Sequence, residues 1–104
     1  MATRLSDIEI QRELASVPGW MRRGNALTRT FECPDFPAAV AFVNRIAEVA
    51  ERMNHHPDID IRYTKVACHL STHSAGGITR RDFQLASAID GAFAAGGTTA
   101  GRTD

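Results

Sequence analysis

The sequence predicts an α+β domain in which a four-stranded antiparallel sheet carries three helices on one face, in the order α-ββα-ββα. Three observations lead to this fold class. Two segments with the alternating pattern of β-hairpins are each followed by a segment with helical spacing of apolar residues, and a shorter helical segment precedes them. Alternation of apolar and polar residues is typical of a sheet that is covered on one face only, so the helices are expected on its apolar face.

The first helix is predicted over residues 6–16. Ser6 and Glu9 have the spacing of a capping box, in which each side chain satisfies a free backbone N–H group at the start of the helix. The first hairpin is predicted to join residues 20–23 to residues 26–33. A glycine-asparagine pair between them is a two-residue turn signal, and the second strand alternates apolar and polar residues.

The second helix is predicted over residues 36–53, with Asp35 as its N-cap. Its apolar residues follow helical spacing over its whole length, which makes it the clearest element in the chain. The segment Asn54-His55-His56-Pro57 is predicted to end it, because the residue before a proline disfavours helical backbone.

The second hairpin is predicted to join residues 59–63 to residues 66–70, with its turn near Thr64-Lys65. A loop follows, and Thr79 is predicted to cap the third helix. Gly96-Gly97 is predicted to end that helix, because glycine is enriched just past helix C-termini.

Composition restricts the function further. The 104 residues fit a single domain over residues 1–95, followed by a tail at 96–104 that is expected to be disordered. Twelve basic and twelve acidic residues give no net charge, which argues against nucleic acid as a partner. The longest apolar run, Ala38 to Val43, is far too short to span a membrane, and the charged N-terminus does not resemble a secretory signal. Cys33 and Cys68 form no CxxC motif, so a reducing, cytoplasmic setting is expected.

Histidine is unevenly distributed, and this points to the site. His55, His56, His69 and His73 all lie within one short stretch of the chain. An imidazole exchanges protons near neutral pH, so two or three around one pocket can supply both an acid and a base. Glu51 lies four residues before His55 on the same predicted helix and is therefore expected to orient that ring.

Structural explanations compete with a functional one for each of these residues. The role of His55 and His56 could be limited to a favourable interaction with the negative end of the helix dipole. The arrival of His73 from a distant segment favours a shared site. His69 is predicted to be a solvated strand residue, and Asp82 has capping-box spacing from Thr79, so its carboxylate could serve only the start of the third helix.

Two other chemistries fit less well. Three histidines and a carboxylate can hold zinc, but adjacent residues on a helix point about 100° apart, and no HExxH motif is present. A cysteine nucleophile is disfavoured, because Cys68 and His69 would lie on opposite faces of a strand.

Several of these residues together resemble the pterin-4a-carbinolamine dehydratase family. The segments that carry the resemblance are Glu51-Arg52-Met53-Asn54-His55-His56-Pro57, Tyr63, Leu70-Ser71-Thr72-His73 and Arg81-Asp82. The similarity extends over about residues 5–94 and includes features upstream of the histidines. The family fold, a four-stranded antiparallel sheet with three helices on one side, agrees with the predicted order of elements.

The resemblance implies dehydration of 4a-hydroxytetrahydrobiopterin to quinonoid dihydrobiopterin, which recycles the pterin of aromatic amino-acid hydroxylases. It implies that no metal or organic cofactor is needed. By the same resemblance, His55 and His73 are the acid and base and His56 binds and orients the pterin. The substrate-binding residues that it implies are Glu51, Ser71, Thr72 and Asp82.

The resemblance also implies partners. Besides the pterin, a second copy of the chain is expected, as a homodimer or homotetramer. Two alternative functions stay open at this point. One is a protein-interaction module, because similar mammalian proteins are also dimerisation cofactors for a transcription factor. The other is a related pterin role, such as molybdopterin metabolism.

Overall fold

The computed structural model describes residues 3–102, with side chains described for residues 3–96. Its helices and strands occur in the predicted order α-ββα-ββα: α1 (Asp7–Glu13), β1 (Met21–Arg23), β2 (Ala26–Glu32), α2 (Phe36–Met53), β3 (Asp58–Arg62), β4 (Lys65–Leu70) and α3 (Arg80–Arg102). Two short 3₁₀ turns, η1 (Leu14–Ser16) and η2 (His73–Ala75), follow α1 and β4. The predicted fold class is confirmed.

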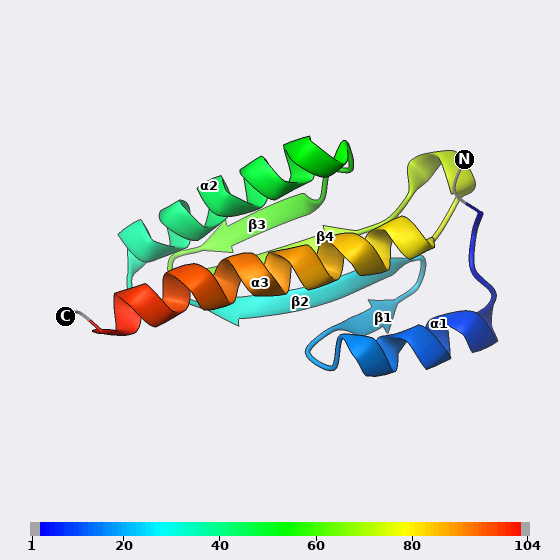
Figure 1. Ribbon diagram of the computed structural model, residues 1–104, viewed down its shortest axis with the longest axis horizontal. Coiled ribbons are helices and arrows are strands. Elements are labelled where there is room, and N and C mark those ends of the chain that lie inside the picture. The colour runs from blue at the N-terminus through cyan, green and yellow to red at the C-terminus, as the bar shows by residue number, and fades with distance from the viewer. Residues whose placement is uncertain (1–2, 103–104) are drawn as a thin grey trace.

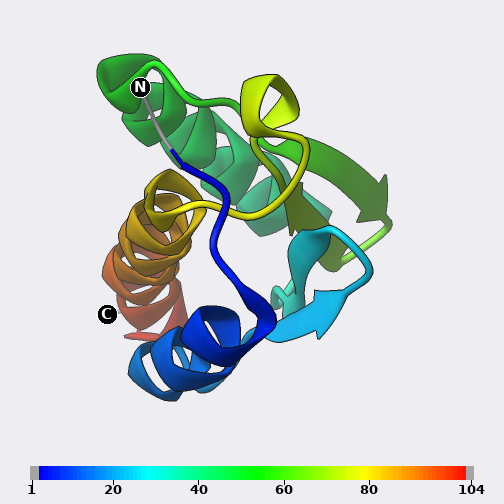
Figure 2. The ribbon, with the colours of Figure 1, turned by 90° about the vertical axis from the view of Figure 1, so that its right-hand side faces the viewer.

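The four strands form one antiparallel sheet in the order β1-β2-β4-β3. All three helices lie on one side of this sheet (Figure 2), and α3 runs between α2 and α1 (Figure 1). The core fills the space between the two layers. At its centre, the ring of Phe31 from β2 lies 4.9 Å from Phe42 of α2 and 4.9 Å from Phe93 of α3, measured between centroids. These aromatic contacts hold both long helices against the sheet.

The capping box at the start of α1 is confirmed. The backbone N–H of Glu9 donates to the Ser6 hydroxyl at 3.2 Å, and the backbone N–H of Ser6 donates to the Glu9 carboxylate at 2.8 Å. The latter bond lowers the pKa of Glu9 below its ordinary value.

Five of the eight predicted strand ends differ from the observed ones by one residue, and two of these differences have a clear structural cause. Trp20 precedes β1, because its backbone N–H bonds the Val17 carbonyl and its buried indole donates to Asp90 at 2.8 Å. The second hairpin turns at Tyr63-Thr64, one residue earlier than predicted. Tyr63 has a φ of 56° and is largely exposed, so it belongs to the turn and not to the strand.

The third helix continues past its predicted end. Gly96-Gly97 was expected to stop it, but α3 extends to Arg102. Glycine lowers helix propensity but can still adopt helical backbone, so the pair disfavours continuation of the helix without preventing it. Residues 103–104, the end of the tail that is predicted to be disordered, lie outside the described part of the chain. Within the described residues, no helix combines the length and the apolar character needed to cross a membrane.

Candidate active site

The end of α2 sets the directions of two histidines. Asn54 adopts left-handed backbone with a φ of 51°. Its N–H donates to the Glu51 carbonyl at 3.2 Å, and the N–H of His55 donates to the Ala50 carbonyl at 3.1 Å. This pair of bonds is a Schellman motif, which reverses the chain at the helix end. As a result His55 is buried, whereas His56 is exposed.

His55 belongs to a buried hydrogen-bond network centred on Asp82. Its Nε2 lies 2.6 Å from Oδ1 of Asp82, a residue with no exposed surface. Oδ2 of Asp82 accepts from the Thr72 hydroxyl at 2.8 Å and from the Thr79 backbone N–H at 2.9 Å. The carboxylate therefore caps the start of α3, as its spacing from Thr79 predicts, and it also holds an imidazole, a role that helical spacing predicts for Glu51.

The contact with the Asp82 carboxylate selects one tautomer of His55. An ionised carboxylate can only accept hydrogen bonds, so Nε2 of His55 must carry the proton between them. That leaves Nδ1 to accept or release a proton, and among the described residues it has no hydrogen-bond partner. The network thus orients the ring and leaves one nitrogen available.

A cavity of about 270 Å³ brings the predicted histidines together, and we call it the histidine cavity. His73 reaches it from η2, which follows β4, whereas His55 and His56 reach it from the end of α2. The lining residues are Asn54, His55, His56, Ser71, Thr72, His73, Ser74 and Arg81. His69 is exposed on β4 and does not line it.

Glu51 does not contact His55 as expected. Its Oε1 instead lies 3.3 Å from Nε2 of His56, and both side chains are mostly exposed. The helical spacing of four residues does not apply, because the left-handed Asn54 redirects the chain before His55. Glu51 and Asp82 also lie outside the lining of the histidine cavity.

Arg81 and Thr79 are parts of the site whose contacts sequence reasoning did not identify. Nη2 of Arg81 donates to the carbonyl groups of Met53 at 3.0 Å and Asn54 at 2.7 Å, and the residue lines the histidine cavity. The hydroxyl of Thr79 lies 2.8 Å from that of Thr72. A cation near the carbonyl end of a helix is a recognisable preference, but the sequence does not show that α3 starts beside the end of α2.

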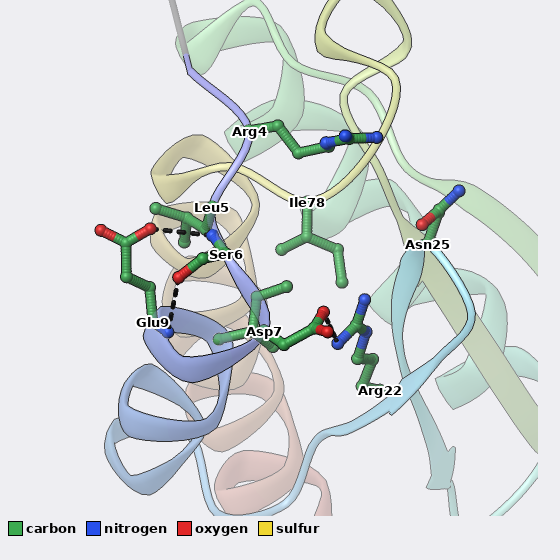
Figure 3. A pocket seen from close by; sticks show the side chains of 9 residues that line it. Arg4, Leu5, Ser6, Asp7, Glu9, Arg22, Asn25 and Ile78 are labelled. Atoms are coloured by element: carbon green, nitrogen blue, oxygen red, sulfur yellow. Dashed lines mark hydrogen bonds and ion pairs between the residues drawn. The ribbon is translucent and has the colours of Figure 1, made fainter.

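A second, larger cavity lies between α1 and β1 (Figure 3). Its lining residues are Arg4, Leu5, Ser6, Asp7, Glu9, Ile10, Arg22, Asn25 and Ile78, and its volume is about 520 Å³. It contains no histidine, and Arg22 pairs with Asp7 across it at 2.8 Å. Of these two cavities, only the histidine cavity is lined by side chains that exchange protons near neutral pH, so it is the candidate active site. In the part of the chain that is described, no group of three or more His, Cys, Asp or Glu side chains is arranged to hold a metal ion.

The comparison with protein families matches residues 3–92 to the model described as Pterin 4 alpha carbinolamine dehydratase. A protein of Roseiflexus sp. (strain RS-1), whose name assigns it provisionally to pterin-4-alpha-carbinolamine dehydratase, is 56% identical over 90 residues, which cover 86% of this chain and 97% of that protein. A protein of Nocardia farcinica with the same name is 55% identical over 86 residues, covering 83% and 90%.

Solved structures give a matching result. The crystal structure of a transcriptional coactivator/pterin dehydratase from Brucella melitensis is similar to this chain with a TM-score of 0.83 and 33% identity, over 86% of this chain and 98% of the other. A pterin dehydratase-like protein identified as a RuBisCO assembly factor in the alpha-carboxysome matches with a TM-score of 0.61 and 22% identity, over 71% and 88%. The latter likeness concerns the fold alone.

Proposed function

Since the chain belongs to the pterin-4a-carbinolamine dehydratase family, we propose that it removes water from 4a-hydroxytetrahydrobiopterin. The product is quinonoid dihydrobiopterin, so the reaction would recycle the pterin used by aromatic amino-acid hydroxylases. One observation carries the proposal: an imidazole held by a buried carboxylate lines the same cavity as a second imidazole from a distant segment. This arrangement suits a reaction that needs a proton acceptor and a proton donor around one ring.

The proposed reaction balances with two proton transfers. One histidine accepts the proton from the ring nitrogen, while the other donates a proton to the 4a-hydroxyl group. The carbon–oxygen bond breaks, water leaves, and the electrons of the nitrogen–hydrogen bond form the new carbon–nitrogen double bond. We assign the two transfers to His55 and His73, without ordering them, and for His55 we assign Nδ1 as the reacting atom.

The remaining residues support these two histidines. His56 is proposed to bind and orient the pterin, and Glu51 to orient His56 through their 3.3 Å contact. Ser71 lines the cavity and is proposed to hold the ring edge. Thr72 also lines it, but its hydroxyl is already donated to Asp82, so its proposed role is to support the carboxylate that holds His55.

The experiment that tests the proposal is a dehydration assay on freshly generated 4a-hydroxytetrahydrobiopterin. We expect the wild-type protein to accelerate water loss well above the uncatalysed rate at neutral pH. A rate equal to the uncatalysed one, with folded protein, would exclude the dehydratase and favour a protein-interaction role.

We also propose that the chain forms a homodimer or homotetramer. Phe36 and Val40 on α2 and Ile61 on β3 are large apolar side chains that are 48%, 38% and 38% exposed, which supports a covered surface in solution. Light scattering coupled to size-exclusion chromatography would measure the mass, and a monomer at micromolar concentration would contradict this part.

The buried, unpaired thiols of Cys33 and Cys68 support a reducing, cytoplasmic setting.

A further inference from the structure

The loop that carries His73 is closed on itself. Thr72 and Gly77 face each other at its base, where the N–H of Thr72 donates to the Gly77 carbonyl at 2.9 Å and the N–H of Gly77 donates back at 3.3 Å. Between them, the 3₁₀ turn η2 ends at Gly76, whose φ is 73°. Among the described residues the His73 ring has no hydrogen-bond partner, so the backbone of this loop sets where His73 lies.

Two hydrogen bonds connect the segment before α1 to this loop and to the residue that follows it. The N–H of Leu5 donates to the Ile78 carbonyl at 2.9 Å, directly after the loop. Nη1 of Arg4 donates to the Gly76 carbonyl at 3.4 Å. Figure 3 shows Arg4 extended from the N-terminal segment past Ile78, and Figure 2 shows that segment crossing between the first turn of α3 and the loop.

Gly77 lies directly under the side chain of Arg4. A Cβ atom at Gly77 would lie 2.7 Å from Cδ of Arg4, which is closer than side chains approach. The backbone of Gly77 is not left-handed, so alanine at this position is restricted by Arg4 and not by its own conformation. The absence of a side chain at Gly77 therefore lets the stem of Arg4 lie flat on the loop.

We propose that Arg4 is a positioning residue for His73: it holds the loop over residues 72–77 so that this imidazole lines the histidine cavity together with His55. The inference rests on the proposed function, because a positioning role has meaning only if His73 transfers a proton. A displacement of about 1 Å between reacting groups can lower a rate by up to 10²-fold. Arg4 therefore affects the chemical step without touching the substrate.

The test is a double-mutant cycle between Arg4→Ala and Gly77→Ala, with Arg62→Ala as a matched control at an exposed arginine on β3. Because the Arg4 side chain is exposed and its bond to Gly76 is 3.4 Å long, we expect each of the first two variants to lower kcat by about three- to five-fold, while KM changes less than about two-fold. The double variant should be no slower than Arg4→Ala alone, because the added methyl group no longer meets the arginine stem. Arg4→Lys, which keeps the stem and a donor, should recover most of the rate, and Arg62→Ala should match wild type.

A second readout separates positioning from stability and from the proposed reaction. The NMR signals of the His73 ring should shift in Arg4→Ala, whereas those of His56 should not. A wild-type kcat in Arg4→Ala, additive losses in the double variant, or a change in melting temperature alone would overturn the inference. If the wild-type protein did not dehydrate the pterin at all, the proposed function would fail, and the NMR signals would still report whether Arg4 holds the loop.

Discussion

The imidazole of His55 and the carboxylate of Asp82 lie 2.6 Å apart, although 27 residues separate them in the chain. The contact joins the end of α2 to the first turn of α3. It also places a fully buried carboxyl group beside the cavity in which we propose proton transfer. A buried carboxylate is stable only when its oxygens have donors, and here Oδ1 contacts His55 while Oδ2 accepts from Thr72 and Thr79.

Asp82→Asn should lower kcat for dehydration by about 10²-fold or more. An amide has one accepting oxygen, and the Thr79 backbone N–H can only donate, so the amide oxygen must stay on that side. The amide nitrogen then faces His55 and forces Nε2 to accept, which moves the ring proton to Nδ1. The measurement is kcat with a folding control by circular dichroism. A folded Asp82→Asn protein with wild-type kcat would show that the tautomer of His55 does not matter.

Thr72→Val should lower the free energy of unfolding by about 1–3 kcal/mol, because it leaves a buried carboxylate oxygen with one donor fewer. Thr72→Ser keeps the hydroxyl and serves as the matched variant. Urea denaturation of both proteins measures the difference. Equal unfolding free energies for valine and serine would mean that the Thr72 hydroxyl contributes nothing to the network.

Glu51→Gln should reduce kcat/KM by no more than about five-fold. Its contact with His56 is exposed and 3.3 Å long, and exposed pairs of this kind contribute little. The effect should appear mainly in KM, since His56 is proposed to orient the pterin. Steady-state kinetics of Glu51→Gln and Asp82→Asn, measured under the same conditions, make the comparison. A loss in kcat as large as that of Asp82→Asn would instead place Glu51 in the proton-transfer step.

Stability should fall at alkaline pH because of Cys68. Burial raises the pKa of this thiol from 9.0 to about 12. Between these values the unfolded chain releases the proton and the folded protein keeps it, so the stabilising contribution, complete below pH 9, is lost as the pH rises toward 12. The expected slope is up to about 1.4 kcal/mol per pH unit. Unfolding of wild type and Cys68→Ala across this range measures it, and identical slopes would contradict the assignment.

Much of the fold follows from local sequence signals. The capping box of Ser6 and Glu9 and the N-cap Asp35 each define a helix start through contacts within three residues. Such signals are legible because both partners lie in one short segment. The prediction of where α3 ends was less accurate, because Gly96-Gly97 lowers helix propensity but does not prevent helical backbone.

The site was less predictable than the fold for the same physical reason. The sequence indicated that His55 and His73 share a pocket, but it paired Glu51 with His55 by helical spacing. The left-handed backbone of Asn54 breaks that spacing. The partner of His55 is Asp82, and that pairing depends on how α2 and α3 pack, which local patterns do not encode.

The central claim is that His55 and His73 carry the two protons of the dehydration. The most direct measurement is the rate of water loss from 4a-hydroxytetrahydrobiopterin with wild type, His55→Ala, His73→Ala and the double variant, each verified as folded. We expect each single variant to lose about 10²-fold or more and the double variant to approach the uncatalysed rate. Full activity in the folded double variant would contradict the account.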